Sequence, residues 1–207
     1  DQYLQPVIYD LKNSEKLDLK INCSISWTYA TWFSNEKIIY YGVKKDSKTS
    51  GMFSYDLKSN EEKLEEEISG GYVSFIKFFG SEVIFFIEKY NGEKSLKSLK
   101  VNGDVVAISD NVVEVYDIEI IDENIYLLGR MSDNVYSLYD LSKNKRLIFN
   151  FPSKVIFEKG LSHTDNGEIL FIGNNDGSTK EKIYAYANDS IYMINLDSGD
   201  YTFIEIN

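Results

Sequence analysis

Ile38-Ile39-Tyr40-Tyr41-Gly42 is the first of four short apolar runs that recur along this chain of 207 residues. The four runs begin at residues 38, 83, 125 and 169 and read IIYYG, VIFFI, IYLLG and ILFIG. Their starts are therefore 45, 42 and 44 residues apart. Spacing kept this closely over four copies indicates an internal repeat, in which each copy supplies one supersecondary unit. Runs of this kind are typical of strands that are covered on both faces.

A second repeated element is an alternating segment that follows each run and ends in a polar turn. Alternation with a period of two, closed by Asn, Gly, Ser or Asp, predicts a strand that enters a hairpin with a further short strand. The copies are FSYDLK at 53–58, LKSLKV at 96–101, YSLYDL at 136–141, YMINLD at 192–197 and, without two strands before it, VIYDLK at 7–12.

A weaker first strand in each copy completes an antiparallel four-stranded unit. A period of about 40–45 residues is typical of the blades of a β-propeller, so we expect an all-β propeller with about 4.5 blades. The first strands, expected near 24–33, 72–79, 112–121 and 155–163, would line its central channel. The units lie in one domain or fragment, 1–207, as a half unit at 3–20 and fuller units at 21–68, 69–111, 112–152 and 153–207.

Two alternatives to this interpretation stay open at the level of the sequence. A β-sandwich of repeated hairpins also has short strands at regular spacing, although the period near 44 residues argues against it. The acidic segment 58–67 contains good helix formers, although an exposed outer strand explains it better. Its charges would also protect such an edge strand from aggregation.

The same pattern supports a resemblance to known families. An apolar run, a variable loop, a segment such as Tyr55-Asp56-Leu57 or Tyr139-Asp140-Leu141, a polar turn and a short strand follow one another over residues 3–207. In this the chain resembles the β-propeller repeats of TolB-like, dipeptidyl-peptidase-like and low-density-lipoprotein-receptor-like proteins. It has neither the Gly-His and Trp-Asp signature of WD repeats nor the Tyr-Trp-Thr-Asp motif of the receptor propellers. The resemblance therefore implies a fold and no subfamily function.

Ring closure is a separate question. The N-terminal half unit supplies late strands, while the last unit already ends with its own, 201–206. We therefore expect further blades or another chain to complete the ring.

Composition excludes several functional classes. The net charge is −11, from 33 acidic and 22 basic residues without a basic run, and would repel a phosphate backbone, so nucleic acid is not an expected partner. No stretch has the roughly 18 consecutive apolar residues of a membrane-spanning helix. The first residue is Asp1 rather than Met. Together with the resemblance, this favours an extracellular or cell-envelope location, with the cytoplasm as the alternative.

Chemistry that depends on cysteine or histidine has little support, because Cys23 and His163 are the only residues of their types. One cysteine allows neither an internal disulfide nor a cysteine metal cluster, and one histidine makes a zinc site improbable. Ser162, His163 and Asp165 share one turn and cannot form a catalytic triad. Acidic turns such as 174–177 lack the carboxylate spacing of a calcium loop. We expect no metal, no cofactor and no catalytic residue.

Seven residues are candidates for ligand binding. The aromatic ones lie on a proposed inner strand, where large rings at a channel mouth can stack on sugars or anchor a partner, although burial between blades is the simpler explanation. The carboxylates lie on or beside the proposed inner strand near 112–121. The candidates are Trp27, Tyr29, Trp32, Asp117, Glu119, Asp122 and His163.

The absence of any recognisable catalytic motif favours a non-catalytic binding platform for protein–protein interaction, part of a larger exported or cell-envelope protein. The sequence does not favour an enzyme. One alternative is a propeller that binds glycans through Trp27 and Trp32 or hydrolyses them with paired carboxylates. Another is the non-catalytic propeller of a peptidase whose catalytic domain lies elsewhere. Exposed aromatic side chains beside two acids at one channel mouth would favour the carbohydrate function.

Overall fold

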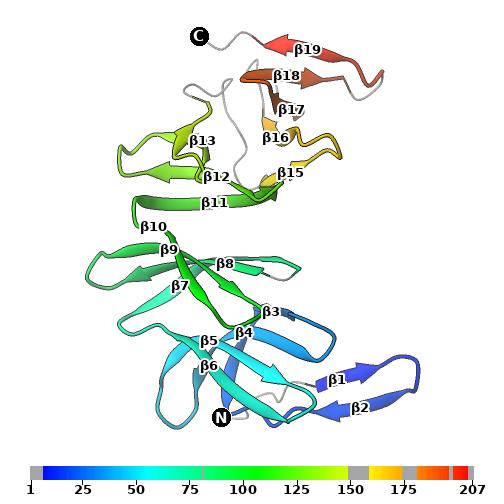
Figure 1. Cartoon of the computed structure of the whole chain (residues 1–207), viewed down its shortest axis with the longest axis vertical. Coiled ribbons are helices and arrows are strands. Elements are labelled where there is room, and N and C mark those ends of the chain that lie inside the picture. The colour runs from blue at the N-terminus through cyan, green and yellow to red at the C-terminus, as the bar shows by residue number, and fades with distance from the viewer. Residues whose placement is uncertain (1–6, 81, 149–158, 174–180, 196–197, 205–207) are drawn as a thin grey trace. The chain divides into compact units, whose positions relative to one another are not determined.

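The computed structural model describes residues 7–80, 82–148, 159–173, 181–195 and 198–204. The described residues form antiparallel sheets whose strands follow one another in chain order (Figure 1). The chain divides into two compact units, 1–110 and 111–207, and each is described by itself. The expected boundaries of the repeat units stay a prediction.

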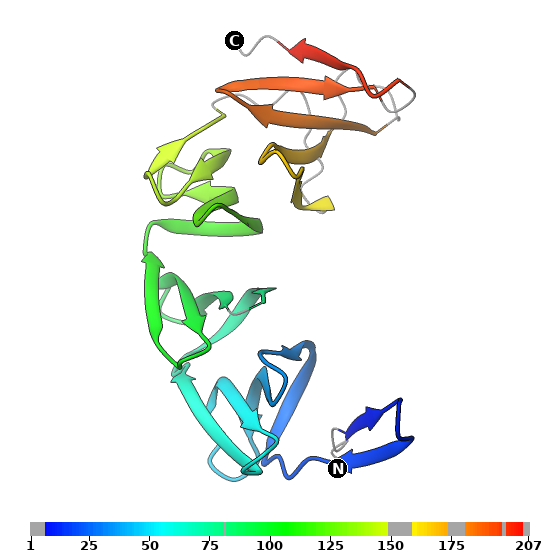
Figure 2. The same cartoon turned by 45° about the vertical axis from the view of Figure 1, so that its right-hand side comes forward.

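The N-terminal unit contains one hairpin and two four-stranded sheets (Figures 1 and 2). The hairpin pairs β1 (Val7–Asp10) with β2 (Glu15–Asp18). The first sheet contains β3 (Cys23–Trp32), β4 (Lys37–Lys44), β5 (Ser50–Asp56) and β6 (Glu61–Glu67). The second contains β7 (Gly71–Phe79), β8 (Glu82–Lys89), β9 (Lys94–Lys100) and β10 (Val105–Ser109).

The second unit contains one four-stranded and one five-stranded sheet. The four strands are β11 (Val112–Ile121), β12 (Asn124–Met131), β13 (Tyr136–Asp140) and β14 (Lys145–Arg146). The five are β15 (Leu161–His163), β16 (Ile169–Gly173), β17 (Lys182–Ala187), β18 (Ser190–Ile194) and β19 (Tyr201–Ile204).

The four apolar runs form β4, β8, β12 and β16, the second strand of each sheet, as the sequence predicts. They are among the most buried strands, because each has a strand on either side and apolar side chains on both faces. Val83, Ile84 and Phe85, for example, are fully buried. The acidic segment at 61–67 is the outer strand β6, so its helical alternative is wrong.

The last sheet differs from the predicted four-stranded unit. A two-residue turn at Asn188 and Asp189, both with positive φ (49° and 56°), joins β17 to β18. Asn and Asp tolerate this left-handed conformation, which matches the twist of a hairpin. The extra hairpin inserts β17 after β16, so the first three residues of the alternating segment 192–197 lie on the fourth strand of this sheet, β18.

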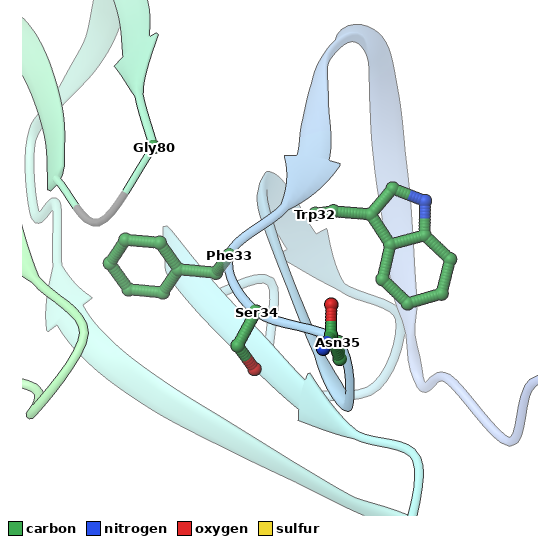
Figure 3. Close-up of a pocket in the computed structure, with 5 residues that line it drawn as sticks. All are labelled: Trp32, Phe33, Ser34, Asn35 and Gly80. Carbon is green, nitrogen blue, oxygen red and sulfur yellow. The ribbon is translucent and has the colours of Figure 1, made fainter.

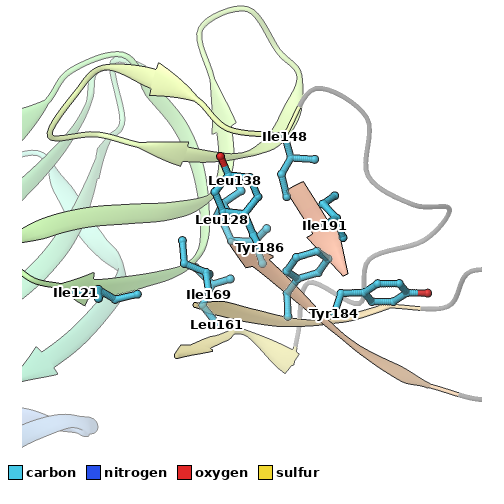
Figure 4. Packing of buried hydrophobic residues seen from close by; sticks show 10 residues of the cluster. Ile121, Leu128, Leu138, Ile148, Leu161, Ile169, Tyr184, Tyr186 and Ile191 are labelled. Carbon is cyan, nitrogen blue, oxygen red and sulfur yellow. The ribbon is translucent and has the colours of Figure 1, made fainter. Parts of the chain in front are cut away.

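Apolar clusters lie between successive sheets within each unit. In the N-terminal unit, Ile39 and Met52 of the first sheet pack with Val83, Phe85 and Leu99 of the second. The β1–β2 hairpin also packs on the first sheet, through Ile8. In the second unit, side chains of β12 and β13 meet those of β16, β17 and β18, as Figure 4 shows; they include Leu128, Leu138, Ile169, Tyr184 and Ile191.

The aspartate of the repeated Tyr-Asp-Leu segment has a structural role. Its carboxylate accepts hydrogen bonds from main-chain N–H groups of the turn that follows. In the β5–β6 turn, Asp56 Oδ1 accepts from Lys58 N and Ser59 N, both at 2.9 Å, and these bonds, from Ser59 above all, lower the pKa of Asp56. Asp10 and Asp140 make the same kind of contact. The motif therefore recurs because it closes the hairpin.

Glycines at the ends of the apolar runs permit close approach of the first strand. Gly129 of β12 lies opposite an irregular part of β11, where a Cβ atom would overlap the main-chain oxygen of Glu114. A Cβ atom on Gly42 of β4 would lie 3.0 Å from the main-chain oxygen of Ser24, a tight but less severe contact.

Gly129→Ala is expected to lower the free energy of unfolding by about 1–3 kcal/mol, because β11 would have to move away. Urea denaturation followed by circular dichroism measures this change. Gly42→Ala is the graded control and should cost less. Equal effects at the two positions would contradict the steric explanation.

Candidate functional site

The seven candidate residues are distributed over both units. Trp32 belongs to the N-terminal unit, and Asp117, Glu119, Asp122 and His163 belong to the second. The side chains of Trp27 and Tyr29 lie outside the described residues, although their main chain is part of β3.

Three candidates meet where the inner strands of two neighbouring sheets approach each other. Asp117 and Glu119 lie on β11, and His163 lies on β15. Asp117 Oδ2 accepts a hydrogen bond from Leu161 N at 2.6 Å. His163 Nδ1 lies 3.2 Å from Glu119 Oε1. Both contacts join residues 44 positions apart, which is one repeat. They therefore join corresponding positions of two successive repeats within the second unit.

The Asp117 side chain joins the main chains of β11 and β15 by hydrogen bonds. Its second oxygen, Oδ1, accepts from Ile118 N at 2.8 Å, so both carboxylate oxygens are bound to main-chain donors. Gly160 has a φ of 72°, and a Cβ atom there would overlap Asp117 Oδ2. A glycine is thus required for the approach of β15 to this carboxylate.

Glu119 and His163 form the more accessible part of this contact. The side chain of Glu119 is 12% exposed and that of His163 is 43% exposed. The carboxylate holds the orientation of the imidazole ring, and a charged pair forms when His163 is protonated. Asp122 has a different position, in the β11–β12 turn, where it is exposed and has a φ of 48°. Its position in this turn accounts for Asp122 without a role in ligand binding.

Trp32 lines a pocket of about 410 Å³ in the N-terminal unit (Figure 3). It is the last residue of β3, where it pairs with Ile38, and it is 49% exposed. The other lining residues come from the β3–β4 turn and from the end of β7; they are Phe33, Ser34, Asn35 and Gly80. Trp32 could be identified as a candidate from the sequence, but the residues that surround it could not.

Tyr72 and Tyr90 form an exposed aromatic pair that the sequence does not predict. Tyr72, at the start of β7, is 43% exposed, and Tyr90, in the β8–β9 turn, is 80% exposed. Their ring centroids are 6.3 Å apart. Only the pairing of β7 with β8, which places Tyr90 N on Gly70 O, brings the two rings together. In the sequence, the only indication of this pair was a tyrosine at each of two strand ends, and tyrosines at such positions are common in this chain.

A charged cluster between the two sheets of the second unit lines a smaller cavity of about 260 Å³. Lys145 Nζ lies 2.9 Å from Asp189 Oδ1, which also accepts the hydroxyl of Tyr186 at 2.7 Å. Burial and Asp189 raise the pKa of Tyr186, and Lys145 lowers the pKa of Asp189. Because Asp189 already holds both donors, this cluster joins the sheets rather than offering a vacant charge.

Cys23 is a buried residue of the core. Burial, together with Glu62, raises the pKa of its thiol to about 12, so the thiol is not a reactive nucleophile. Among the residues that the structure describes, no three His, Cys, Asp or Glu side chains are grouped to hold a metal ion. Within the same residues, no helix is long and apolar enough to span a membrane.

Comparison with known proteins gives structural likeness only. No protein-family model matches the chain, and no curated protein matches its sequence. Among solved structures, oligogalacturonate lyase from Vibrio parahaemolyticus is 10% identical, with a TM-score of 0.53, over 96% of this chain and 70% of that one. A prolyl endopeptidase is 14% identical, with a TM-score of 0.53, over 90% of this chain and 30% of that one.

TolB from Acinetobacter baumannii is 15% identical, with a TM-score of 0.45, over 97% of this chain. The present chain spans 48% of the length of that protein. At these identities the likeness to the lyase and the endopeptidase concerns the fold alone. Together with the sequential antiparallel sheets, it identifies the chain as a β-propeller repeat protein with about four to five blades.

Proposed function

We propose that the chain is a non-catalytic binding platform whose ligands are proteins. The observation that carries this proposal is the use of the inner-strand candidates. Both oxygens of Asp117 hold main-chain N–H groups, and Glu119 holds His163, so these side chains join neighbouring strands. A general acid–base pair needs carboxylates that can reach a substrate. The carboxylate of Asp117 is not available in that way.

Tyr72 and Tyr90 are the proposed contact with the partner. Tyrosine is enriched in the energetic centres of protein interfaces, since it combines a large apolar ring with a hydroxyl that can bond. The two rings lie next to each other and leave 43% and 80% of their residues' surface exposed. They would bury this surface against a partner.

Photo-crosslinking tests the proposed interface. A photoreactive amino acid in place of Tyr90 is expected to give a discrete adduct with one protein, and the adduct should weaken when Tyr72 is also changed to alanine. Lys100, exposed at the end of β9, is the matched position that should give none. An equal set of adducts at both positions, or none at Tyr90, would contradict the proposal.

Asp117→Ala tests the structural role of the inner strands. The change leaves the main-chain N–H groups of Leu161 and Ile118 without this acceptor, so we expect a loss of about 1–3 kcal/mol in the free energy of unfolding. Asp165→Ala, at an exposed turn position, is the control and should change little. If Asp117→Ala instead abolished turnover of a saccharide or peptide without changing stability, the chain would be an enzyme.

Two other functions remain secondary hypotheses. A glycoside-hydrolysing propeller would need a carboxylate pair within reach of a substrate. A peptidase propeller would need a catalytic domain outside these residues; the resemblance to dipeptidyl-peptidase-like repeats and the structural likeness to a prolyl endopeptidase are the support for it. An extracellular or cell-envelope location is also part of the proposal, and cell fractionation would test it.

A further inference from the structure

Main-chain hydrogen bonds close the turn that lines the pocket beside Trp32. Phe33 N and Ser34 N both donate to Lys37 O, at 2.7 and 3.1 Å, and close the β3–β4 turn. Phe33 is only 4% exposed and packs into the apolar cluster between the two sheets of this unit. Figure 3 shows its ring directed away from the indole of Trp32. The turn is therefore anchored before any ligand arrives, which lowers the entropic cost of binding.

The polar groups of the pocket are available for a ligand. Among the residues that the structure describes, neither the indole of Trp32 nor the amide of Asn35 has a hydrogen-bond partner. The hydroxyl of Ser34 accepts a hydrogen bond from Glu36 N at 3.3 Å, which leaves its proton free to be donated. An amide, an indole N–H and a hydroxyl thus offer both donors and an acceptor.

The chemistry of the lining is neutral. None of the five lining residues has an ionisable side chain, although the protein carries a net charge of −11. An anionic ligand would meet no cation in the pocket and an unfavourable overall field, and a cationic ligand would meet no carboxylate. Gly80 leaves open space on its side of the pocket, because no atom lies within 4 Å of the position a Cβ atom would take.

We propose that this pocket binds a neutral saccharide. One pyranose ring would place its C–H face on the indole of Trp32, and its hydroxyl groups would bond with Asn35 and Ser34. A ring that is apolar on its face and polar at its edge complements an exposed indole beside two uncharged polar side chains. The volume, about 410 Å³, lies within the usual range of ligand pockets, roughly 300–1,000 Å³.

This saccharide site goes beyond the proposed protein interface and does not depend on it. An apolar side chain inserted here would offer no hydrogen bond to the exposed Asn35 amide or Ser34 hydroxyl, whereas the hydroxyl groups of a saccharide can bond with both. The observations therefore favour a sugar over a peptide at Trp32.

Intrinsic fluorescence tests the inference, since Trp27 and Trp32 are the only tryptophans. The Trp27→Phe protein is titrated with maltohexaose and with cellohexaose. We expect a saturable change in Trp32 emission with at least one of them, with a dissociation constant of about 1 mM or tighter. Isothermal titration of the wild-type protein gives the same constant without the Trp27 substitution.

Variants locate the site. Trp32→Ala is expected to weaken saccharide binding at least about tenfold, which is about 1.4 kcal/mol, and Asn35→Ala to weaken it less. Tyr90→Ala, which removes another exposed aromatic ring of this unit, should leave binding unchanged. Circular dichroism and thermal unfolding confirm that each variant is folded.

Three results would overturn the inference. They are no saturable binding of either hexasaccharide up to about 10 mM, undiminished binding by Trp32→Ala, or tighter binding of oligogalacturonate than of the neutral sugars. If neither sugar binds and Trp32→Ala instead removes the Tyr90 photo-adduct, the pocket belongs to a protein interface. Failure of the saccharide test alone leaves the Tyr90 result, and with it the proposed function, unaffected.

Discussion

Replacing Phe85 with alanine is expected to lower the free energy of unfolding of the N-terminal unit by about 3–5 kcal/mol. Phe85 is fully buried on β8, and it packs with Ile39 and Met52 of the neighbouring sheet. Truncation would remove apolar contact on the side where two sheets meet and would leave a cavity. Closing that cavity would require the sheets themselves to move, because their main chains are fixed by ladders of hydrogen bonds.

Guanidinium denaturation and hydrogen exchange measure this effect. Because β4 and β5 share the cluster with Phe85, their amides should also exchange faster in the Phe85→Ala protein. Tyr90→Ala is the matched control, since it removes an aromatic ring that is 80% exposed, and it should cost little. A loss of stability confined to β7–β10, or below about 1 kcal/mol, would show that the two sheets do not stabilise each other.

Glu65→Leu is expected to cost roughly 3 kcal/mol, near the lower end of the cost of breaking a buried ion pair. The side chain of Glu65 is 1% exposed, and its oxygens bind Lys63, Lys37 at 3.1 Å and the hydroxyl of Ser54 at 2.6 Å. Its removal leaves the buried Ser54 hydroxyl and the largely buried Lys37 without their acceptor. Lys63 is exposed and water replaces its partner, which limits the cost.

The same carboxylate predicts a dependence of stability on pH. Burial raises the pKa of Glu65, but hydrogen bonds from Lys63, Ser54 and Lys37 outweigh burial, and the pKa lies below its usual value of 4.5. A carboxyl group whose pKa is lower in the folded state stabilises the protein fully above the unfolded pKa. That contribution is lost as the pH falls through the folded pKa.

Denaturation at a series of pH values below 5 tests this dependence. Glu65→Gln should lose less stability on acidification than the wild type does, because one group with a lowered pKa is gone. Glu61→Gln is the control, since Glu61 is an exposed residue at the start of the same strand, β6. If the wild type and Glu65→Gln had identical pH profiles, the ion cluster would not contribute to stability.

The repeat and the class of fold could be predicted from the sequence because their causes are local. A strand covered on both faces needs a continuous apolar run, and IIYYG at 38–42 and its copies meet that need. The turn after the third strand needs an acceptor for its N–H groups, and Asp56 supplies it two and three residues away. Both causes act within a few residues, so they leave a pattern in the sequence.

The fifth strand of the last sheet was harder to predict from the sequence. Tyr184 and Tyr186 with Asn188 and Asp189 indicate a hairpin, but nothing local states whether that hairpin adds a strand to a sheet or lies outside it. The pairing of β16 with β17 decides this, and it depends on contacts between two segments that are not adjacent in the sequence.

The candidate sites depended on tertiary structure even more. Asp117 and Glu119 look like any other acids among 33, and only the approach of β11 to β15 joins them to Leu161 and His163, 44 residues away. In the same way, Trp32 belongs to a pocket only because the end of β7 brings Gly80 beside the β3–β4 turn.

By itself the sequence determined that this chain forms repeated antiparallel sheets, because hydrophobic periodicity and turn chemistry act over a few residues. Only the tertiary structure decided that the inner-strand acids fasten neighbouring sheets and that Trp32 faces a neutral pocket. The physical reason is that the role of a polar side chain depends on which donors and acceptors reach it. Packing between sheets that are one repeat apart in the sequence determines these donors and acceptors.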